Sequence, residues 1–209
     1  FPHGGELSIA HGGIAIPVIN PLSMETIKAN LDLANAAHPF AVSLVIDSAG
    51  LPHLKKVSPD AGAKSVEQLR ELCEYTEMPV IIKGVMTAQG AVKAADAGAA
   101  AIVVSNHGGR VLAGAAATAE VLPEIVEAVG GRVKIIVDGG IRSGTDIFRA
   151  LALGADAVMI CRPFLISYYG GRTDGIVTYI EKLRAELKDA MYMCGARKIS
   201  DIDRSMIRF

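Results

Sequence analysis

A histidine and an arginine follow directly on an apolar run in the segment Ala101-Ile-Val-Val-Ser-Asn-His-Gly-Gly-Arg110. The imidazole of His107 can titrate near neutral pH, so it could take a proton from a substrate. The guanidinium of Arg110 suits a carboxylate, and the glycines between the two residues leave room for a planar ligand to approach the backbone. The pattern predicts a substrate with an acid group beside the carbon being oxidised. A tight turn with a structural histidine is the plainer alternative.

Two further loops follow later apolar runs: Asp138-Gly-Gly-Ile-Arg142 and Cys161-Arg-Pro-Phe164. In barrels, the loops after the seventh and eighth strands commonly bind a phosphate through backbone N–H groups and a helix N-terminus. The side chains of Arg142 and Arg162 would add positive charge there. We therefore expect a phosphorylated cofactor, with an ordinary Asp-Gly-Gly turn as the alternative.

Short β-branched runs alternate with longer segments of helical period, which is the pattern of βα units in a parallel sheet. The sequence predicts six strands, at Ile14–Ile19, Ala41–Ile46, Val80–Ile82, Ala101–Val104, Val133–Val137 and Ala157–Ile160. It predicts helices near Met24–Ala36, Ser65–Tyr75, Thr87–Ala97, Ala119–Val129, Gly144–Leu153 and Gly175–Met193. Gly98 and Gly154 would end two of these helices in the left-handed conformation, and Thr145 and Asp146 could cap another.

The candidate polar residues gather at the carboxyl ends of the predicted strands, which form the active face of a barrel. We therefore predict an α/β fold of the (β/α)8 TIM-barrel class. A doubly wound sheet is less favoured, because no GxGxxG follows a first strand. Strands 3 to 8 are recognisable, and the two N-terminal strands are expected to be missing from the chain. Residues 1–209 would form one domain that opens with a loop over Phe1–Gly13, where His-Gly-Gly steps at His3 and His11 favour a loop over a metal site.

The composition limits the classes of partner. The 209 residues are 51% hydrophobic and carry a formal charge of −1, which favours a small ligand over nucleic acid or an anionic membrane surface. The sequence shows no leader pattern and no apolar run of membrane-spanning length, so the expected location is the cytoplasm. The cysteines show no CxxC spacing, which argues against a disulfide framework or a zinc site. Cys73, Cys161 and Cys194 are expected to be buried thiols.

Together the three motifs resemble the signature blocks of the FMN-dependent α-hydroxy-acid oxidases and dehydrogenases, a family that includes lactate and glycolate oxidases. The similar segments are Ser105–Arg110, Asp138–Arg142 and Cys161–Phe164. The resemblance runs from about Val80 to the C-terminal segment 191–208 and is weaker before Val80. It implies bound FMN, oxidation of a small 2-hydroxy acid to the 2-oxo acid, and a homo-oligomer.

The resemblance also assigns roles to single residues. His107 would be the active-site base, Asp47 the carboxylate that orients it, and Arg110 the anchor of the substrate carboxylate. Lys83 and Ser105 would contact the flavin ring system, with the lysine near N1 and the C2 carbonyl. The ribityl chain and phosphate would be held by Asp138, Gly139, Gly140, Ile141, Arg142, Cys161 and Arg162. Plainer alternatives exist for the lysine, which could extend to solvent, and for Asp47, which could cap a loop.

The chain also departs from the family pattern. No second arginine follows Asp47 in Ser48-Ala-Gly-Leu-Pro-His53, and Val45 stands where a threonine is expected. The segment Ile16–Asn20 lacks the glutamine and tyrosine expected there, and Cys161 replaces a glycine, so its Cβ would crowd a phosphate if the backbone needed glycine-like torsions. Two alternatives to an oxidase therefore stay open. One is an FMN-binding barrel with little hydroxy-acid activity, and the other is a flavin-dependent enzyme similar to isopentenyl-diphosphate isomerase.

Overall fold

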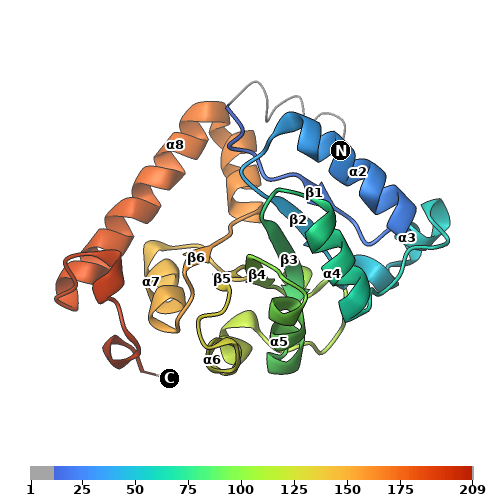
Figure 1. The fold of residues 1–209 in the computed structure, drawn as a ribbon. Helices are drawn as coiled ribbons and strands as arrows, with labels where there is room; N and C mark the ends of the chain where they lie inside the picture. Colours follow the sequence, from blue (N-terminus) through green and yellow to red (C-terminus); the bar gives the residue numbers. More distant parts are fainter. Residues whose placement is uncertain (1–11, 209) are drawn as a thin grey trace.

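The computed structural model describes residues 12–208 and contains one parallel sheet surrounded by helices (Figure 1). Its six strands are hydrogen-bonded in sequence order: β1 (Val18–Ile19), β2 (Val42–Val45), β3 (Val80–Val85), β4 (Ala101–Val104), β5 (Lys134–Val137) and β6 (Ala157–Val158). The helices are α2 (Met24–Ala37), α3 (Pro52–Val57), α4 (Val66–Tyr75), α5 (Ala88–Asp96), α6 (Thr118–Val129), α7 (Gly144–Ala152) and α8 (Arg162–Met193). Short 3₁₀ turns include η1 (Asp47–Gly50) and η2 (His107–Gly109). Most of the predicted opening loop, with His3 and His11, lies outside the described residues.

Alternate side chains of the strands enter two different apolar clusters, because successive residues of a strand point to opposite faces. The larger cluster packs one face against the helices and includes Val42, Leu44, Ile82, Ile102, Val104 and Val137 from strands with Leu31, Leu69, Leu122 and Ile125 from helices. The other face carries a smaller cluster of Ala41, Ile81, Ala101, Val103 and Ile136. Lys83, Ser105 and Asp138 each stand two residues after a member of this smaller cluster. The strand period therefore brings these polar residues to the face opposite the helices.

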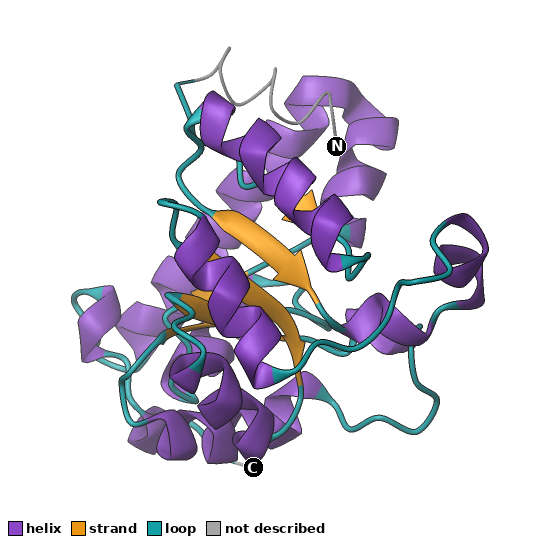
Figure 2. Cartoon of the chain, turned by 45° about the vertical axis from the view of Figure 1, so that its right-hand side comes forward, coloured by secondary structure: helices purple, strands orange, loops and turns teal. Residues whose placement is uncertain are grey.

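The helices begin where the sequence supplies a capping oxygen. Ser23, Ser65, Thr87 and Ser143 each accept a hydrogen bond from the backbone N–H three residues on. After α5 and α7 the chain reverses at Gly98 and Gly154, whose φ angles of 91° and 102° lie in the left-handed region. Both glycine turns were predicted, and they set the direction in which the following strand enters the sheet. In Figure 2 the helices surround the strands, and long loops join them.

Two predicted elements differ most from the structure, whereas β6 only ends earlier, at Val158 instead of Ile160, and α3 was not predicted. The run Ile14–Ile19 forms only the two-residue strand β1, because Pro17 has no N–H for the ladder. The last helix was predicted from Gly175, but α8 begins at Arg162, since proline is compatible with the first turn of a helix. The two limbs of α8 join at Gly171 and Arg172, whose φ and ψ angles are not helical. Within residues 12–208, no helix combines the length and the apolar character needed to cross a bilayer.

A β-bulge at Gly84, in the ladder between β3 and β4, lies against Asp47 at the end of the sheet that carries the polar residues. The register between β3 and β4 shifts from Lys83 to Val85, and Gly84 has a φ of 106°. A Cβ built on Gly84 would lie 2.5 Å from the Cβ of Asp47. Only glycine therefore allows the Asp47 side chain to lie so close to β3.

Substitution Gly84→Ala should lower the free energy of unfolding by about 3 kcal/mol, since it adds a collision with Asp47 to the cost of a positive φ. The matched control is Gly131→Ala, at a φ of 80° with no atom within 4 Å of the added Cβ. This control should cost only about 1 kcal/mol, the strain of the left-handed conformation alone. Urea denaturation of both variants measures the difference. Equal losses would show that Asp47 can move aside freely.

Candidate active site

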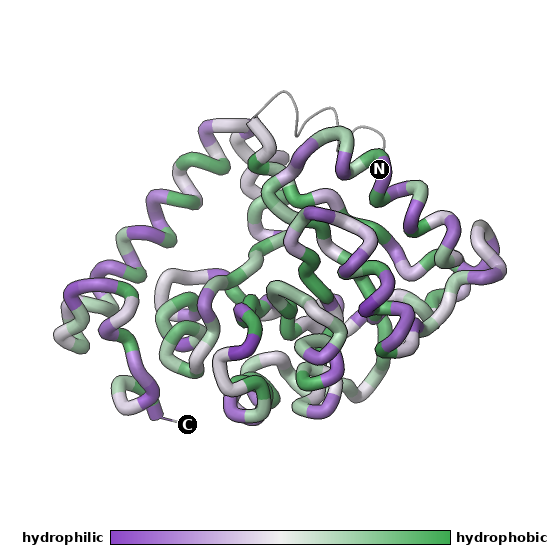
Figure 3. Tube along the Cα trace, in the orientation of Figure 1, coloured by the Kyte–Doolittle hydropathy of each residue, from purple (hydrophilic) through white to green (hydrophobic). Residues whose placement is uncertain are grey.

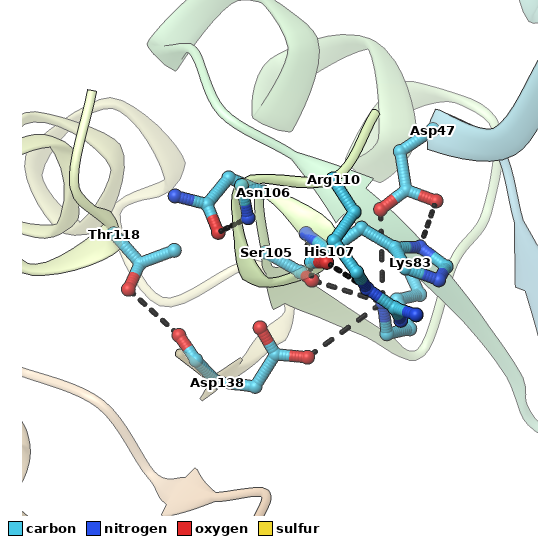
Figure 4. Close-up of polar contacts among 9 residues, drawn as sticks. Asp47, Lys83, Ser105, Asn106, His107, Arg110, Thr118 and Asp138 are labelled. Atoms are coloured by element: carbon cyan, nitrogen blue, oxygen red, sulfur yellow. Dashed lines mark hydrogen bonds and ion pairs between the residues drawn. The ribbon is translucent and has the colours of Figure 1, made fainter. Parts of the chain in front are cut away.

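A lysine amine lies at the centre of a cluster of buried polar groups (Figure 4). Lys83, from β3, donates a hydrogen bond of 2.9 Å to Oγ of Ser105, which follows β4. Its Nζ lies 3.6 Å from Oδ2 of Asp47 after β2 and 3.6 Å from Oδ2 of Asp138 after β5. The side chains of Lys83 and Asp47 are only 12% and 6% exposed. Four neighbouring strands thus deliver one cation, two carboxylates and a hydroxyl to one point, as the spacing of polar residues predicted.

His107 lies at the edge of this cluster and contacts Asp47. Nδ1 of the imidazole is 3.0 Å from Oδ1 of Asp47, and the histidine side chain is 26% exposed. The two oxygens of Asp47 therefore face different partners, one the histidine and the other Lys83. Because the carboxylate can only accept, Nδ1 carries the proton in this contact, and Nε2 is left as the basic nitrogen. The structure brings Asp47 and His107 together as the resemblance implied.

The backbone of the histidine loop is turned by three consecutive left-handed residues. His107, Gly108 and Gly109 have φ angles of 56°, 69° and 74°. Oγ of Ser105 accepts from the backbone N–H of His107 as well as from Lys83. The exposed side chain of Arg110 donates through Nε to the backbone carbonyl of His107, 3.1 Å away. The serine, which has no exposed surface, therefore holds both the lysine and the start of the loop.

Two carboxylate oxygens in the cluster still need donors. Among the described residues, neither Oδ1 of Asp138 nor Oδ2 of Asp47 receives a hydrogen bond, although both atoms are buried. Oδ2 of Asp47 still faces the Lys83 amine at 3.6 Å. A buried acceptor without a donor is costly, so Oδ1 of Asp138 indicates a group that a ligand would complete. The hydroxyls of a ribityl chain are donors of the kind that Asp138 needs. This side of the site fits FMN.

The backbone N–H groups at the N-terminus of α7, which were expected to bind a phosphate, already have acceptors. At the start of α7, Asp146 accepts from the backbone N–H groups of Arg142 and Ser143, and Glu186 of α8 accepts from Gly144. Asp146 caps the helix together with Ser143, as predicted, whereas no cap contact of Thr145 exists among the described residues. The carboxylates of Asp146 and Glu186 occupy the amides at this helix N-terminus. A phosphate bound here would therefore use other N–H groups.

Such groups exist at the start of α8. No described residue accepts a backbone hydrogen bond from Cys161 or Arg162. A Cβ on Gly108 would lie 2.7 Å from Nη2 of Arg162, so this guanidinium reaches the histidine loop. The N-terminus of α8 and Arg162 together fit the phosphate of FMN better than α7 does.

The cysteines correct one prediction, since only one of them is even partly buried. Burial raises the pKa of the Cys73 thiol to about 11, whereas Cys161 and Cys194 are exposed. The φ of Cys161 is −112°, which any residue adopts, so the replacement of glycine introduces no backbone strain.

Other positions were not found from the sequence. Gly84, Glu186 and Thr118 each affect the site through a contact with a distant segment, which a single sequence does not show. The missing second arginine is not replaced by an arginine in α3, whose basic side chains are those of the exposed Lys55 and Lys56.

Comparisons with known proteins show what this chain is similar to. A family model described as FMN-dependent dehydrogenase matches residues 20–209. A peroxisomal (S)-2-hydroxyacid oxidase from Arabidopsis thaliana is 44% identical over 69% of this chain and 39% of its own length. A 4-hydroxymandelate oxidase from Amycolatopsis orientalis is 43% identical over 82% of this chain and 46% of its own. The chain spans less than half of the length of these two relatives.

The fold shows the same relationship. A crystal structure of mandelate oxidase with 3,3-difluoro-2-hydroxy-3-phenylpropionic acid superposes with a TM-score of 0.86 and 32% sequence identity, covering 96% of this chain and 65% of that one. The six parallel strands are therefore the partial TIM barrel that the sequence predicted. With the family model matching nearly the whole chain and the cluster of Lys83 in place, the chain belongs to the FMN-dependent dehydrogenase family.

Proposed function

We propose that this chain carries the FMN site and the base of an oxidoreductase that converts a small 2-hydroxy acid into the 2-oxo acid. The observation that carries the proposal is the 3.0 Å contact between His107 and Asp47, directly beside Lys83. Relatives named as hydroxyacid, hydroxymandelate and lactate oxidases support this class of substrate.

In this proposal His107 removes a proton from the substrate. Asp47 fixes the tautomer, so the lone pair of Nε2 is available, and its negative charge stabilises the imidazolium that forms. Most of the Asp47 side chain is withdrawn from water, which strengthens this interaction. The pair therefore supplies a base whose orientation is set before substrate binds.

Arg110 binds the substrate carboxylate. Its Nε is engaged by the carbonyl of His107, which directs the guanidinium to the same loop and leaves the terminal N–H groups for a carboxylate. One arginine guanidinium is available for the substrate carboxylate, whereas the family pattern has two. We therefore expect weak substrate binding, because half of the usual charge is absent.

FMN, when bound, accepts the two electrons of the reaction. Lys83 supplies a fixed positive charge at the flavin, and Asp138 accepts from the ribityl hydroxyls. Gly139, Gly140, Ile141, Cys161 and the side chains of Arg142 and Arg162 surround the phosphate. Contact of Ser105 with the ring remains a prediction, because its oxygen already accepts two hydrogen bonds.

Several broader features stay proposals. We propose one FMN-binding barrel domain over residues 1–209 that acts on a small molecule and forms a homo-oligomer. The cytoplasmic location also stays a prediction, and relatives from Arabidopsis thaliana and Oryza sativa are named as peroxisomal.

The proposal predicts that the purified protein is yellow and that a 2-hydroxy acid bleaches its flavin band without oxygen. Substitution His107→Ala should slow the bleaching roughly a thousandfold, since it removes the base, while FMN binding is retained. Stopped-flow absorbance with glycolate, lactate and mandelate measures this rate. The matched control is His53→Ala, at an exposed histidine of α3, which should bleach like the original protein.

Two outcomes would contradict the proposal. A yellow protein that none of these acids bleaches would be an FMN-binding barrel without hydroxy-acid activity. A colourless protein that takes up no added FMN would overturn the cofactor as well.

A separate prediction concerns the phosphate. Bound FMN should slow alkylation of Cys161 by iodoacetamide at pH 8 by roughly tenfold or more, because the phosphate covers the N-terminus of α8. Cys194, at the other end of that helix, should react equally with and without FMN. Cys73 should react slowly in both states, because its pKa is raised to about 11. Peptide mass spectrometry separates the three sites, and unprotected Cys161 in a yellow protein would place the phosphate elsewhere.

A further inference from the structure

The histidine loop adopts a conformation that its sequence alone does not favour. A left-handed φ is natural for Gly108 and Gly109 but uncommon for a residue with a side chain such as His107, whose φ is 56°. A non-glycine residue persists there only when surrounding contacts fix it. The contacts that fix this loop should therefore matter to the position of the imidazole.

The side chain of Asn106 makes two of these contacts. Its Oδ1 accepts from the backbone N–H of Gly109, 3.2 Å away, and closes the turn. Its Nδ2 donates over 3.1 Å to the backbone carbonyl of Ala116, at the far end of the loop. One amide thus joins the two ends of the segment that carries His107 and Arg110.

Thr118 extends this connection to the next strand. Its hydroxyl donates over 2.7 Å to the backbone carbonyl of Asp138, and the residue is 4% exposed. Figure 4 shows Asn106 and Thr118 on the side of the cluster away from Asp47. A Cβ on Gly139 would lie 3.3 Å from Oγ1 of Thr118 and 3.7 Å from Oδ1 of Asn106. Both side chains therefore border the same glycine of the cofactor loop.

Helix capping does not account for Thr118. At the start of α6 the carboxylate of Glu120 accepts from the backbone N–H of Ala117. The threonine is the first residue of the helix, and its hydroxyl points to another loop instead of bonding to its own helix. The bond therefore joins two segments and does not serve the helix alone.

We propose that Asn106 and Thr118 are positioning residues, which together clamp the histidine loop to the Asp138 loop. The clamp, defined as these two side chains with Ala116 and Gly139, sets the imidazole of His107 relative to the groups that hold the cofactor. Thr118 acts through the backbone of Asp138, and Asn106 acts through the turn at Gly109. This inference rests on the proposed function for its effect on activity, whereas its structural part is independent of FMN.

The structural part is tested on the unloaded protein by limited trypsin digestion. Arg110 is exposed and lies inside the clamped segment, so release of the clamp should speed cleavage after it. Thr118→Val removes the hydroxyl at nearly constant shape, and Asn106→Ala removes both amide contacts. Each should raise the rate of cleavage after Arg110 by roughly tenfold. Thr118→Ser keeps the hydroxyl and is the matched control, which should cleave like the original protein.

The functional part is tested on the protein loaded with FMN. Thr118→Val should weaken FMN binding roughly tenfold and Asn106→Ala should leave it unchanged, because only Thr118 contacts the Asp138 loop through a hydrogen bond. Both should lower kcat at saturating FMN, and Thr118→Ser should restore it. A purely structural role would instead lower the midpoint of thermal unfolding and raise cleavage at all sites together.

The outcomes separate this inference from the proposed function. Failure of the unaltered protein to bind FMN or to oxidise any hydroxy acid overturns the proposed function, and trypsin cleavage still decides the clamp. Unchanged cleavage after Arg110 in both variants overturns the clamp, whatever the activity. Cleavage that rises equally in Thr118→Ser and Thr118→Val would also overturn it, since the hydroxyl would then have no part.

Discussion

The site depends on a single buried cation between two carboxylates. Lys83 lies at equal distances of 3.6 Å from Asp47 and Asp138, and all three side chains are largely withdrawn from water. Two carboxylates at such a distance from one centre would repel strongly without the amine, because the local dielectric constant is low. Each carboxylate also performs a second task, one toward His107 and one toward the predicted cofactor. The lysine therefore holds together the two halves of the site before any ligand is present.

The parallel sheet makes this cluster possible, and the part that follows from strand period could be predicted from the sequence. Residues two positions after Ile81, Val103 and Ile136 share one face, and parallel neighbours in register end at the same edge. The helical period of the segments between strands likewise predicts the helices, and Gly98 and Gly154 predict where the chain turns back into the sheet. The errors fell where a signal was ambiguous: Pro17 limits β1, and the proline after Arg162 begins a helix.

The contacts that refine the site could not be predicted, because they join segments far apart in the chain. Thr118 bonds to Asp138, twenty residues later, and Glu186 of α8 bonds to Gly144 at the start of α7. A threonine at the start of a helix and a glutamate within one are both common, so the local sequence around Thr118 and Glu186 does not indicate these contacts. Glu186 affects where a phosphate can bind, since it occupies the amide of Gly144 at the N-terminus of α7. The helix dipole identifies two possible anion sites, and only the three-dimensional contacts distinguish them.

Those long-range contacts close a ring around the site. From His107 the ring runs through Asp47, Lys83 and Asp138 to Thr118, then along the backbone to Ala116 and through Asn106 back to the histidine loop. A ring of this kind fixes the left-handed turn from both sides, which explains how a strained histidine can persist on an exposed loop. Stability and orientation of the base therefore depend on different parts of the molecule. The apolar clusters stabilise the barrel, whereas the ring orients the imidazole of His107. Substitutions in the ring can therefore alter chemistry at little cost in stability, provided that they leave no buried charge without its partner.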